Sequence, residues 1–286
     1  MKRVSKIFLG IACFCIGVGI LLSILGVALG RRGVSHAGNN YSYSYTGEDI
    51  KSINLDVKYC RVNIKEGDEF TAEAYNVMEN SFQGYVEGDT LYLKQSGTMT
   101  DTINFFGLDI PFSFGLFDIY DNDSPKIVIT VPSGFIAENI KFDLGAGVIE
   151  VDELSTENAD FEIGAGSMEI RRLNVTDKIS CEVGAGELKV NKLEAKNADF
   201  ECGVGRVIIS GEIKGDLLAD CGMGQIQLDL NGNEEDYNYN VSCGVGKIKL
   251  NDHHYSFSTD DRIRNEDAVG TFDLNCSVGS LEVSIQ

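Results

Sequence analysis

Residues 161–170 read FEIGAGSMEI, in which two glycines flank one small residue between two runs of alternating apolar side chains. The same pattern recurs as FDLGAGVIEV (142–151), CEVGAGELKV (181–190), FECGVGRVII (200–209), ADCGMGQIQL (219–228), VSCGVGKIKL (241–250) and, less regularly, LNCSVGSLEV (274–283). From each unit to the next along the chain, the position of the first glycine, which is Ser277 in the last unit, lies 19, 20, 19, 19, 22 and 33 residues further on. Steps near 20 residues are typical of solenoids, in which each unit buries its apolar surface against its neighbours.

Stacking the units in register gives four apolar columns at a spacing of two residues. In residues 161–170 these columns hold Phe161, Ile163, Met168 and Ile170. Each unit is therefore predicted to be a strand, a tight corner and a second strand. Glycine suits such a corner because the turn tolerates a Cβ poorly and because neighbouring corners stack closely. The predicted structural corners are Gly145, Gly147, Gly164, Gly166, Gly184, Gly186, Gly203, Gly205, Gly222, Gly224, Gly244 and Gly246.

The pattern favours an all-β fold, a parallel β-solenoid of ~20-residue coils whose successive coils pair about 4.8 Å apart. An antiparallel β-sandwich is the alternative, although a sandwich gives no reason for the same columns to recur. A dinucleotide-binding glycine loop is excluded. Its motif needs a third glycine that opens a helix, and Glu169 stands at that position in a continuing strand.

The N-terminal region predicts a membrane anchor. Residues 7–29 contain no charged side chain and are long enough to cross a bilayer, whereas a cleaved signal peptide usually has a shorter apolar region. Basic residues precede this stretch, which favours a cytoplasmic N-terminus. The expected organisation is a short tail and anchor at 1–32, a polar tether at 33–47 and a repeat domain at 48–286. Its location would be the cell membrane, single-pass, with the repeat domain extracytoplasmic.

Three parts of the repeat domain depart from the pattern. INLDVKYCRVNI (53–64) has strand columns without glycines, and is expected to form an atypical terminal coil. A Phe-rich insertion occupies 98–124, and a second insertion at 251–270 interrupts the last coil. Further strands are expected at TAEAYNV (71–77), GDTLYLKQ (88–95) and KIVITVP (126–132).

Neither the cysteines nor the sequence motifs support catalysis. Cys202, Cys221, Cys243 and Cys276 occupy a column that is apolar in the other coils, so we expect buried free thiols rather than disulfides or metal ligands. The sequence contains none of the nucleophile-elbow, zinc-protease or P-loop motifs. The protein is predicted to be neither an enzyme nor a holder of a cofactor.

An acidic column is the candidate binding feature. The net charge of −20 argues against a nucleic-acid partner. The column two residues before the first corner glycine faces outward and holds Asp143, Glu162, Glu182, Glu201 and Asp220. Stacked carboxylates repel one another by about 1 kcal/mol per neighbouring pair in water, so the column is either a solvated face or a site for cations. Candidate partners are divalent cations, cationic envelope-active peptides or another envelope protein. These five carboxylates are the candidate metal ligands.

The anchor, tether and tandem GxG strand units resemble the bacterial putative-adhesin domain family of β-strand repeats, a domain of unknown function. The resemblance covers about residues 48–286 and implies a bacterial envelope protein, in some members linked to envelope stress, without catalytic residues. The function expected is a membrane-anchored, non-enzymatic binding module that is adhesin-like or related to envelope stress. A structural spacer or assembly partner of another membrane protein is the alternative, and an enzyme acting on envelope polymers is a third.

Overall fold

The computed structural model describes residues 38–45, 49–96 and 125–286, together with the backbone of 101–105 and 108–112. Gly38–Gln286 form one compact unit. The predicted anchor at 7–29 lies outside the described residues, and the helices found within them include none long and apolar enough to span a bilayer. Within the Phe-rich insertion, the structure describes two strands, β7 (Asp101–Phe105) and β8 (Leu108–Phe112). They pair with each other in a two-stranded sheet of their own.

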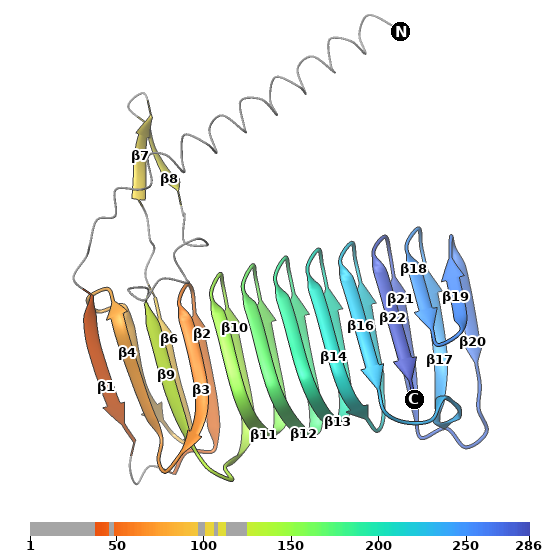
Figure 1. Ribbon diagram of the computed structural model, residues 1–286, viewed down its shortest axis with the longest axis horizontal. Helices are drawn as coiled ribbons and strands as arrows, with labels where there is room; N and C mark the ends of the chain where they lie inside the picture. Colours follow the sequence, from red (N-terminus) through yellow and green to blue (C-terminus); the bar gives the residue numbers. More distant parts are fainter. Residues whose placement is uncertain (1–37, 46–48, 97–100, 106–107, 113–124) are drawn as a thin grey trace, which may run out of the picture. The chain divides into compact units, whose positions relative to one another are not determined.

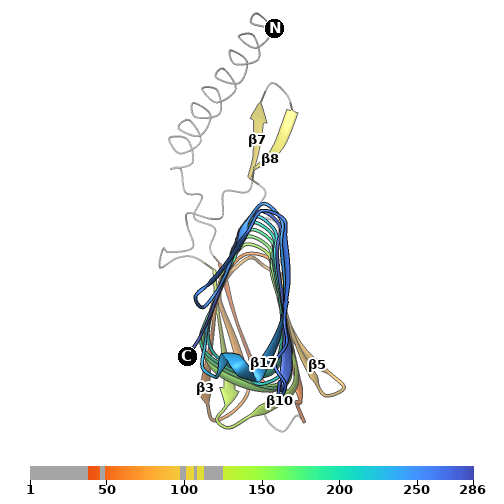
Figure 2. The ribbon, with the colours of Figure 1, turned by 90° about the vertical axis from the view of Figure 1, so that its right-hand side faces the viewer.

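The repeat domain is a solenoid with parallel pairing between coils, so the sandwich alternative was wrong (Figure 1). Its central coils consist of β10 (Ile136–Leu144), β11 (Val148–Ile163), β12 (Ser167–Val183), β13 (Glu187–Cys202) and β14 (Arg206–Ile213). The next coil contains β15 (Leu217–Cys221) and β16 (Gln225–Leu230). In the view along the stack, the coils superpose, and two long sides meet at one narrow corner (Figure 2).

The four apolar columns form the core. Phe161 pairs in register with Phe142 on one side and with Cys181 on the other, and all three side chains are buried. The rings of Phe142 and Phe161 stack with their centroids 5.4 Å apart. Because every coil offers the same inward positions, one continuous hydrophobic core runs the length of the stack.

The coils do not stack in sequence order at the C-terminal end. After β16 the chain forms the 3-10 turn η1 (Glu234–Asp236), β17 (Tyr237–Cys243) and β18 (Lys247–Leu250), and it ends with β21 (Gly270–Cys276) and β22 (Ser280–Ile285). The β21–β22 coil lies between β15–β16 and β17–β18, pairing in parallel with both. The expectation that successive units are neighbours was wrong for these two coils.

The N-terminal end shows the same departure. β2 (Ser52–Val57) and β3 (Arg61–Gly67) form the coil that was expected to be terminal. That coil instead lies between the β10–β11 coil and an outer coil made of β6 (Thr90–Gln95) and β9 (Lys126–Pro132). The Phe-rich insertion connects β6 to β9 in the place where other coils have a glycine corner.

Antiparallel strands cover both ends of the stack. At the N-terminal end, β4 (Thr71–Val77) pairs with β9, β5 (Phe82–Glu87) pairs with β6, and β1 (Asn39–Ser44) pairs with β4. At the other end, the insertion at 251–270 provides β19 (His253–Ser256) and β20 (Thr259–Ile263), which pair with β18 and β17. β1 falls within the residues predicted as a tether, so that prediction was wrong for this strand. Its alternating Tyr and Ser side chains suit a half-exposed edge strand.

Candidate binding surface

The glycine corners stack so closely that a side chain would collide with the next coil. A Cβ built on Gly186 would lie 2.2 Å from the carbonyl oxygen of Gly166, and one on Gly184 would lie 3.0 Å from that of Gly164. The second glycine of a corner is the tighter position in most coils. None of the twelve predicted corner glycines has the positive φ that would itself require glycine. Close stacking is therefore the reason for these residues, and an unusual turn conformation is not.

This packing explains the two corners that lack the full glycine pair. Ser277 stands at the looser first position, while Gly279 keeps the second, where a Cβ would lie 2.2 Å from the carbonyl oxygen of Gly224. The Lys58–Tyr59–Cys60 corner has no glycine because no glycine corner stacks against it on the side of the outer β6–β9 coil. The Phe-rich insertion connects β6 to β9 there instead. The buried Gln95 fills that place, and its Oε1 accepts hydrogen bonds from the backbone N–H groups of Lys58 at 3.1 Å and Tyr59 at 3.0 Å.

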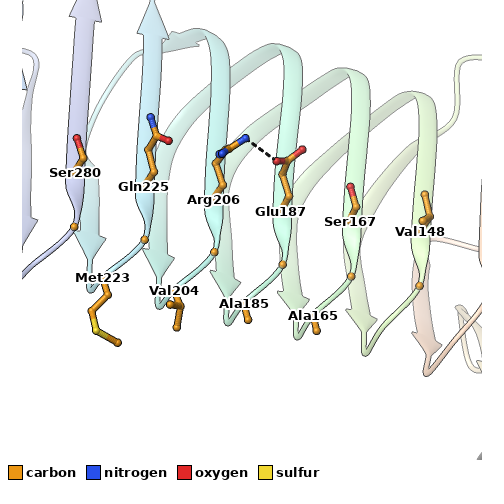
Figure 3. Close-up of a pocket in the computed structure, with 16 residues that line it drawn as sticks. Val148, Ala165, Ser167, Ala185, Glu187, Val204, Arg206, Met223, Gln225 and Ser280 are labelled. Atoms are coloured by element: carbon orange, nitrogen blue, oxygen red, sulfur yellow. Dashed lines mark hydrogen bonds and ion pairs between the residues drawn. The ribbon is translucent and has the colours of Figure 1, made fainter. Parts of the chain in front are cut away.

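A shallow groove of about 890 Å³ runs along the corners (Figure 3). Its floor is formed by the second glycines, from Gly147 to Gly279, and one wall by the residue that follows each of them. The charged pair on this wall is Arg206 with Glu187, at 3.4 Å. The groove thus offers a backbone floor and a wall of mixed small, polar and charged side chains, and it brings no cluster of nucleophilic or acid–base groups together.

The middle residue of each corner points outward from the stack, as Figure 3 shows for Ala165, Ala185, Val204 and Met223. In spatial order these tips change from alanine to larger apolar side chains. We call four consecutive large tips the apolar ridge. The exposed fractions of their side chains are 61% for Val204, 63% for Met223, 56% for Val278 and 68% for Val245. Backbone hydrogen bonds from Met223 to Gly203, Val278 to Gly222 and Val245 to Ser277 hold them on neighbouring coils.

Phe257 extends the ridge at the C-terminal end. It is 76% exposed and has a positive φ of 55° in the turn between β19 and β20. The next residue, Ser258, donates its backbone N–H to the carbonyl oxygen of Gly244 at 2.7 Å, which places this turn beside the Val245 corner. Exposed apolar side chains are ordinary when scattered singly, but a contiguous line of them is typical of an interaction site.

The predicted acidic column lies along one flank of the corners, and the structure divides it into two parts. Asp143 forms an ion pair with Lys58 at 3.5 Å, and Glu162 forms one with Lys141 at 2.9 Å. The hydrogen bonds to Glu162 and then to Asp160 raise the pKa of Lys141. Within the described part of the chain, the remaining three carboxylates make no ion pair. We call them the acidic row: Glu182, Glu201 and Asp220.

Several other exposed charges are paired between neighbouring coils. Lys189 contacts Glu169 at 2.7 Å, and Arg172 contacts Glu153 at 2.7 Å. Hydrogen bonds from Lys189 and then Asn191 lower the pKa of the Glu169 carboxyl. The acidic row differs from these columns because each of its carboxylates has at least one acidic neighbour in the stack and no basic one.

The four column cysteines are buried free thiols in the structure, in the spatial order Cys202, Cys221, Cys276 and Cys243. Burial raises the pKa of Cys221 to about 12. A thiol so far from its ionised form is a poor nucleophile and a poor metal ligand. These side chains therefore serve as small apolar core residues.

The described residues include no group of three or more His, Cys, Asp or Glu side chains placed to hold a metal ion. Asp143, Glu162, Glu182, Glu201 and Asp220 thus form a line along the stack and do not converge on a point. His253 lies on β19 with its Nε2 4.0 Å from a carboxylate oxygen of Glu234, and His254 is its exposed neighbour. The arrangement can offer an extended surface to a partner.

The chain belongs to the Toastrack DUF4097 family, whose sequence profile matches residues 50–264. It is similar to the solved structure of a putative cell adhesion protein from Clostridium sporogenes ATCC 15579, with 13% identity, a TM-score of 0.35 and coverage of 87% of this chain and 99% of that chain. A putative adhesin from Bacteroides fragilis NCTC 9343 is similar with 12% identity, a TM-score of 0.40 and coverage of 85% and 96%. A putative adhesin from Parabacteroides distasonis ATCC 8503 gives 12% identity, a TM-score of 0.36 and coverage of 86% and 97%. No curated protein matches the sequence.

The apolar ridge was not predicted from the sequence. Its signal is the middle corner residue, which changes from Ala185 to Val204 and Met223 along the repeats. Recognising a continuous ridge also required the true coil order, since Val278 and not Val245 lies next to Met223.

Proposed function

We propose that this protein is a membrane-anchored, extracytoplasmic binding module that acts in an adhesin-like way, without catalysis, through the glycine-corner edge of its solenoid. The single observation that carries the proposal is the apolar ridge, a line of exposed aliphatic side chains on four consecutive coils. Contact with a partner removes the apolar surface of these side chains from water, and this burial favours binding. The glycine floor of the groove beside it leaves the backbone open to close approach.

Photo-crosslinking in cells tests this use of the edge. A photoreactive amino acid in place of Met223 should capture a partner, whereas the same group in place of Lys196, an exposed residue away from the corners, should not. Val204→Ser and Val278→Ser in the same chain should weaken the capture at Met223 by removing neighbouring apolar contacts. Equal capture from both positions would contradict the proposal.

The location is tested separately from the surface. With an extracytoplasmic repeat domain, an impermeant amine reagent added to intact cells should label exposed lysines such as Lys196 and Lys214. A cytoplasmic protein carrying accessible lysines is the matched control. Labelling of Lys196 only after cell lysis would exclude the proposed location.

A structural spacer or assembly partner of another membrane protein is the second candidate, favoured by the apolar stretch at residues 7–29. A spacer should capture one stoichiometric membrane partner through that stretch. This capture should persist when Val204, Met223 and Val278 are replaced by serine, which distinguishes it from binding at the ridge.

A further inference from the structure

We infer that the partner of the corner edge is an amphipathic helix with basic residues along one flank, lying parallel to the solenoid axis. This inference rests on the proposed function, because it names the kind of partner that the same surface takes. It is carried by two features that overlap on the coils of Val204 and Met223: the apolar ridge and the acidic row.

The spacing of the ridge tips favours one shape of partner. Ridge tips recur once per coil, at the strand spacing of about 4.8 Å. An α-helix presents side chains of one face about every 5.4 Å, one per turn, so helix and ridge stay close to register over three or four coils. An extended strand presents same-face side chains at about 6.6–6.8 Å and loses this register sooner. The spacing therefore favours a helix over a strand.

Unpaired carboxylates lie beside part of the ridge. Glu201 and Asp220 belong to the same coils as Val204 and Met223, two residues before each corner, and Glu182 lies on the preceding coil. Their mutual repulsion is not relieved by any ion pair within the described residues. Lysine or arginine side chains on the flank of a docked helix would relieve it. Apolar and acidic features side by side thus specify a partner that is apolar on one face and basic beside it.

The charge distribution also distinguishes this partner from a lipid surface. Anionic lipid headgroups would meet the acidic row and a protein with a net charge of −20, so repulsion would oppose the contact. On the opposite flank Arg206 is already paired with Glu187, and Lys247 lies two coils away from Asp220. A basic helix is favoured by the same charges that disfavour an anionic bilayer.

The test uses the full-length protein in non-ionic detergent and two synthetic peptides of about 18 residues, long enough for roughly five helical turns. One is a Leu/Lys peptide with its leucines on one helical face. The other has the same composition in an order that mixes leucine and lysine around the helix. Binding of each peptide is titrated at low salt and at about 0.15 M salt.

Three variants give the comparison. The ridge variant carries Val204→Ser, Met223→Ser and Val278→Ser, all at exposed positions that leave the core intact. The row variant carries Glu182→Gln, Glu201→Gln and Asp220→Asn. The matched control carries Glu157→Gln, Glu235→Gln and Asp267→Asn, which make the same change in net charge at exposed positions away from the corners. Melting curves of each variant report whether the fold is retained.

We expect the amphipathic peptide to bind at least about tenfold more tightly than the mixed peptide. The ridge variant should remove that difference, and the row variant should weaken both peptides, more at low salt than at 0.15 M. The matched control should bind like the unmodified protein. Equal binding of the two peptides, or a ridge variant that binds both unchanged, would overturn the inference while leaving the crosslinking result at Met223 to decide the proposed function.

Two further outcomes would also overturn it. Binding to phosphatidylcholine vesicles that is lost in the ridge variant, without binding of the amphipathic peptide, would assign the ridge to a lipid surface. A dimer in sedimentation that dissociates in the ridge variant would assign the ridge to a second copy of the chain.

Discussion

Cys221 lies in register with Cys276 and not with Cys243, which is the next cysteine of the same column in the sequence. The C-terminal coil is thus inserted between two coils that precede it. The insertion leaves the β17–β18 coil at the end of the stack, where β19 and β20 cover its outer edge. β19 and β20 thereby pair the outer backbone groups of β17 and β18, and the outer edge becomes that of two short, polar strands, HHYS and TDDRI. Short and charged edge strands are poor templates for pairing with another chain.

Crosslinking of cysteine pairs should report this coil order. Asp220→Cys with Asn275→Cys places two thiols at outward-facing positions of neighbouring strands in register, whereas Asp220→Cys with Ser242→Cys places them two coils apart. Two coils correspond to about 9.6 Å, beyond the ~7 Å between Cα atoms that a disulfide can bridge. Mild oxidation followed by non-reducing electrophoresis should show a crosslink for the first pair. A crosslink in the second pair alone would support sequence-ordered coils.

Gly186→Ala should destabilise the protein more than Gly184→Ala. The added Cβ would lie 2.2 Å from a backbone oxygen in the first case and 3.0 Å in the second. We expect a loss of about 1–3 kcal/mol or more in the free energy of unfolding for Gly186→Ala, and a smaller loss for Gly184→Ala. Denaturant titration of the two variants measures the difference. Equal losses would mean that stacking distance does not set the need for glycine.

Gln95→Leu should weaken the N-terminal end of the stack. The substitution removes the side-chain oxygen that accepts hydrogen bonds from the N–H groups of Lys58 and Tyr59. The Lys58 N–H keeps the backbone carbonyl of Gln95 as an acceptor, so the part-buried Tyr59 N–H loses its partner, at a cost of about 1–3 kcal/mol. Hydrogen exchange should rise first at Lys58, Tyr59 and their neighbours. Gln83→Leu, at an exposed site on β5, is the control and should leave exchange there unchanged.

Stability should fall at alkaline pH because of the buried thiols. Burial raises the pKa of Cys221 from 9.0 to about 12, so the folded state holds this proton more tightly than the unfolded state does. The resulting stabilisation is complete below about pH 9 and is lost as pH rises toward 12, by up to about 1.4 kcal/mol per pH unit.

The matched variant is Cys221→Val, which keeps an apolar side chain at this core position and does not titrate. Its free energy of unfolding should fall less steeply between pH 9 and 11 than that of the unmodified protein. Groups that titrate in this range away from the cysteine column are common to both proteins and cancel in the comparison. Parallel pH profiles would show that the Cys221 thiol does not contribute to the alkaline loss.

Several features were predictable because they are local and repeated. Phe161, Ile163, Met168 and Ile170 recur at a spacing of two, and this alone identifies the inward faces of the strands. Glycine at Gly164 and Gly166 in one unit and at equivalent places in the others marked the corners. The acidic column followed from the same alternation, since a residue between two inward positions must face outward.

Only the tertiary structure decided the order of the coils, the covering strands and the pairing of the acidic residues. Every coil presents the same types of residue to its neighbours, so Cys221 could pack against Cys243 or Cys276 at similar cost, and the column pattern cannot choose between them. β1 was missed although its Tyr and Ser side chains alternate, because its composition is that of a polar tether and its pairing depends on β4. The apolar ridge depends on that choice as well, because Met223 and Val278 become neighbours only when the last coil is inserted into the stack.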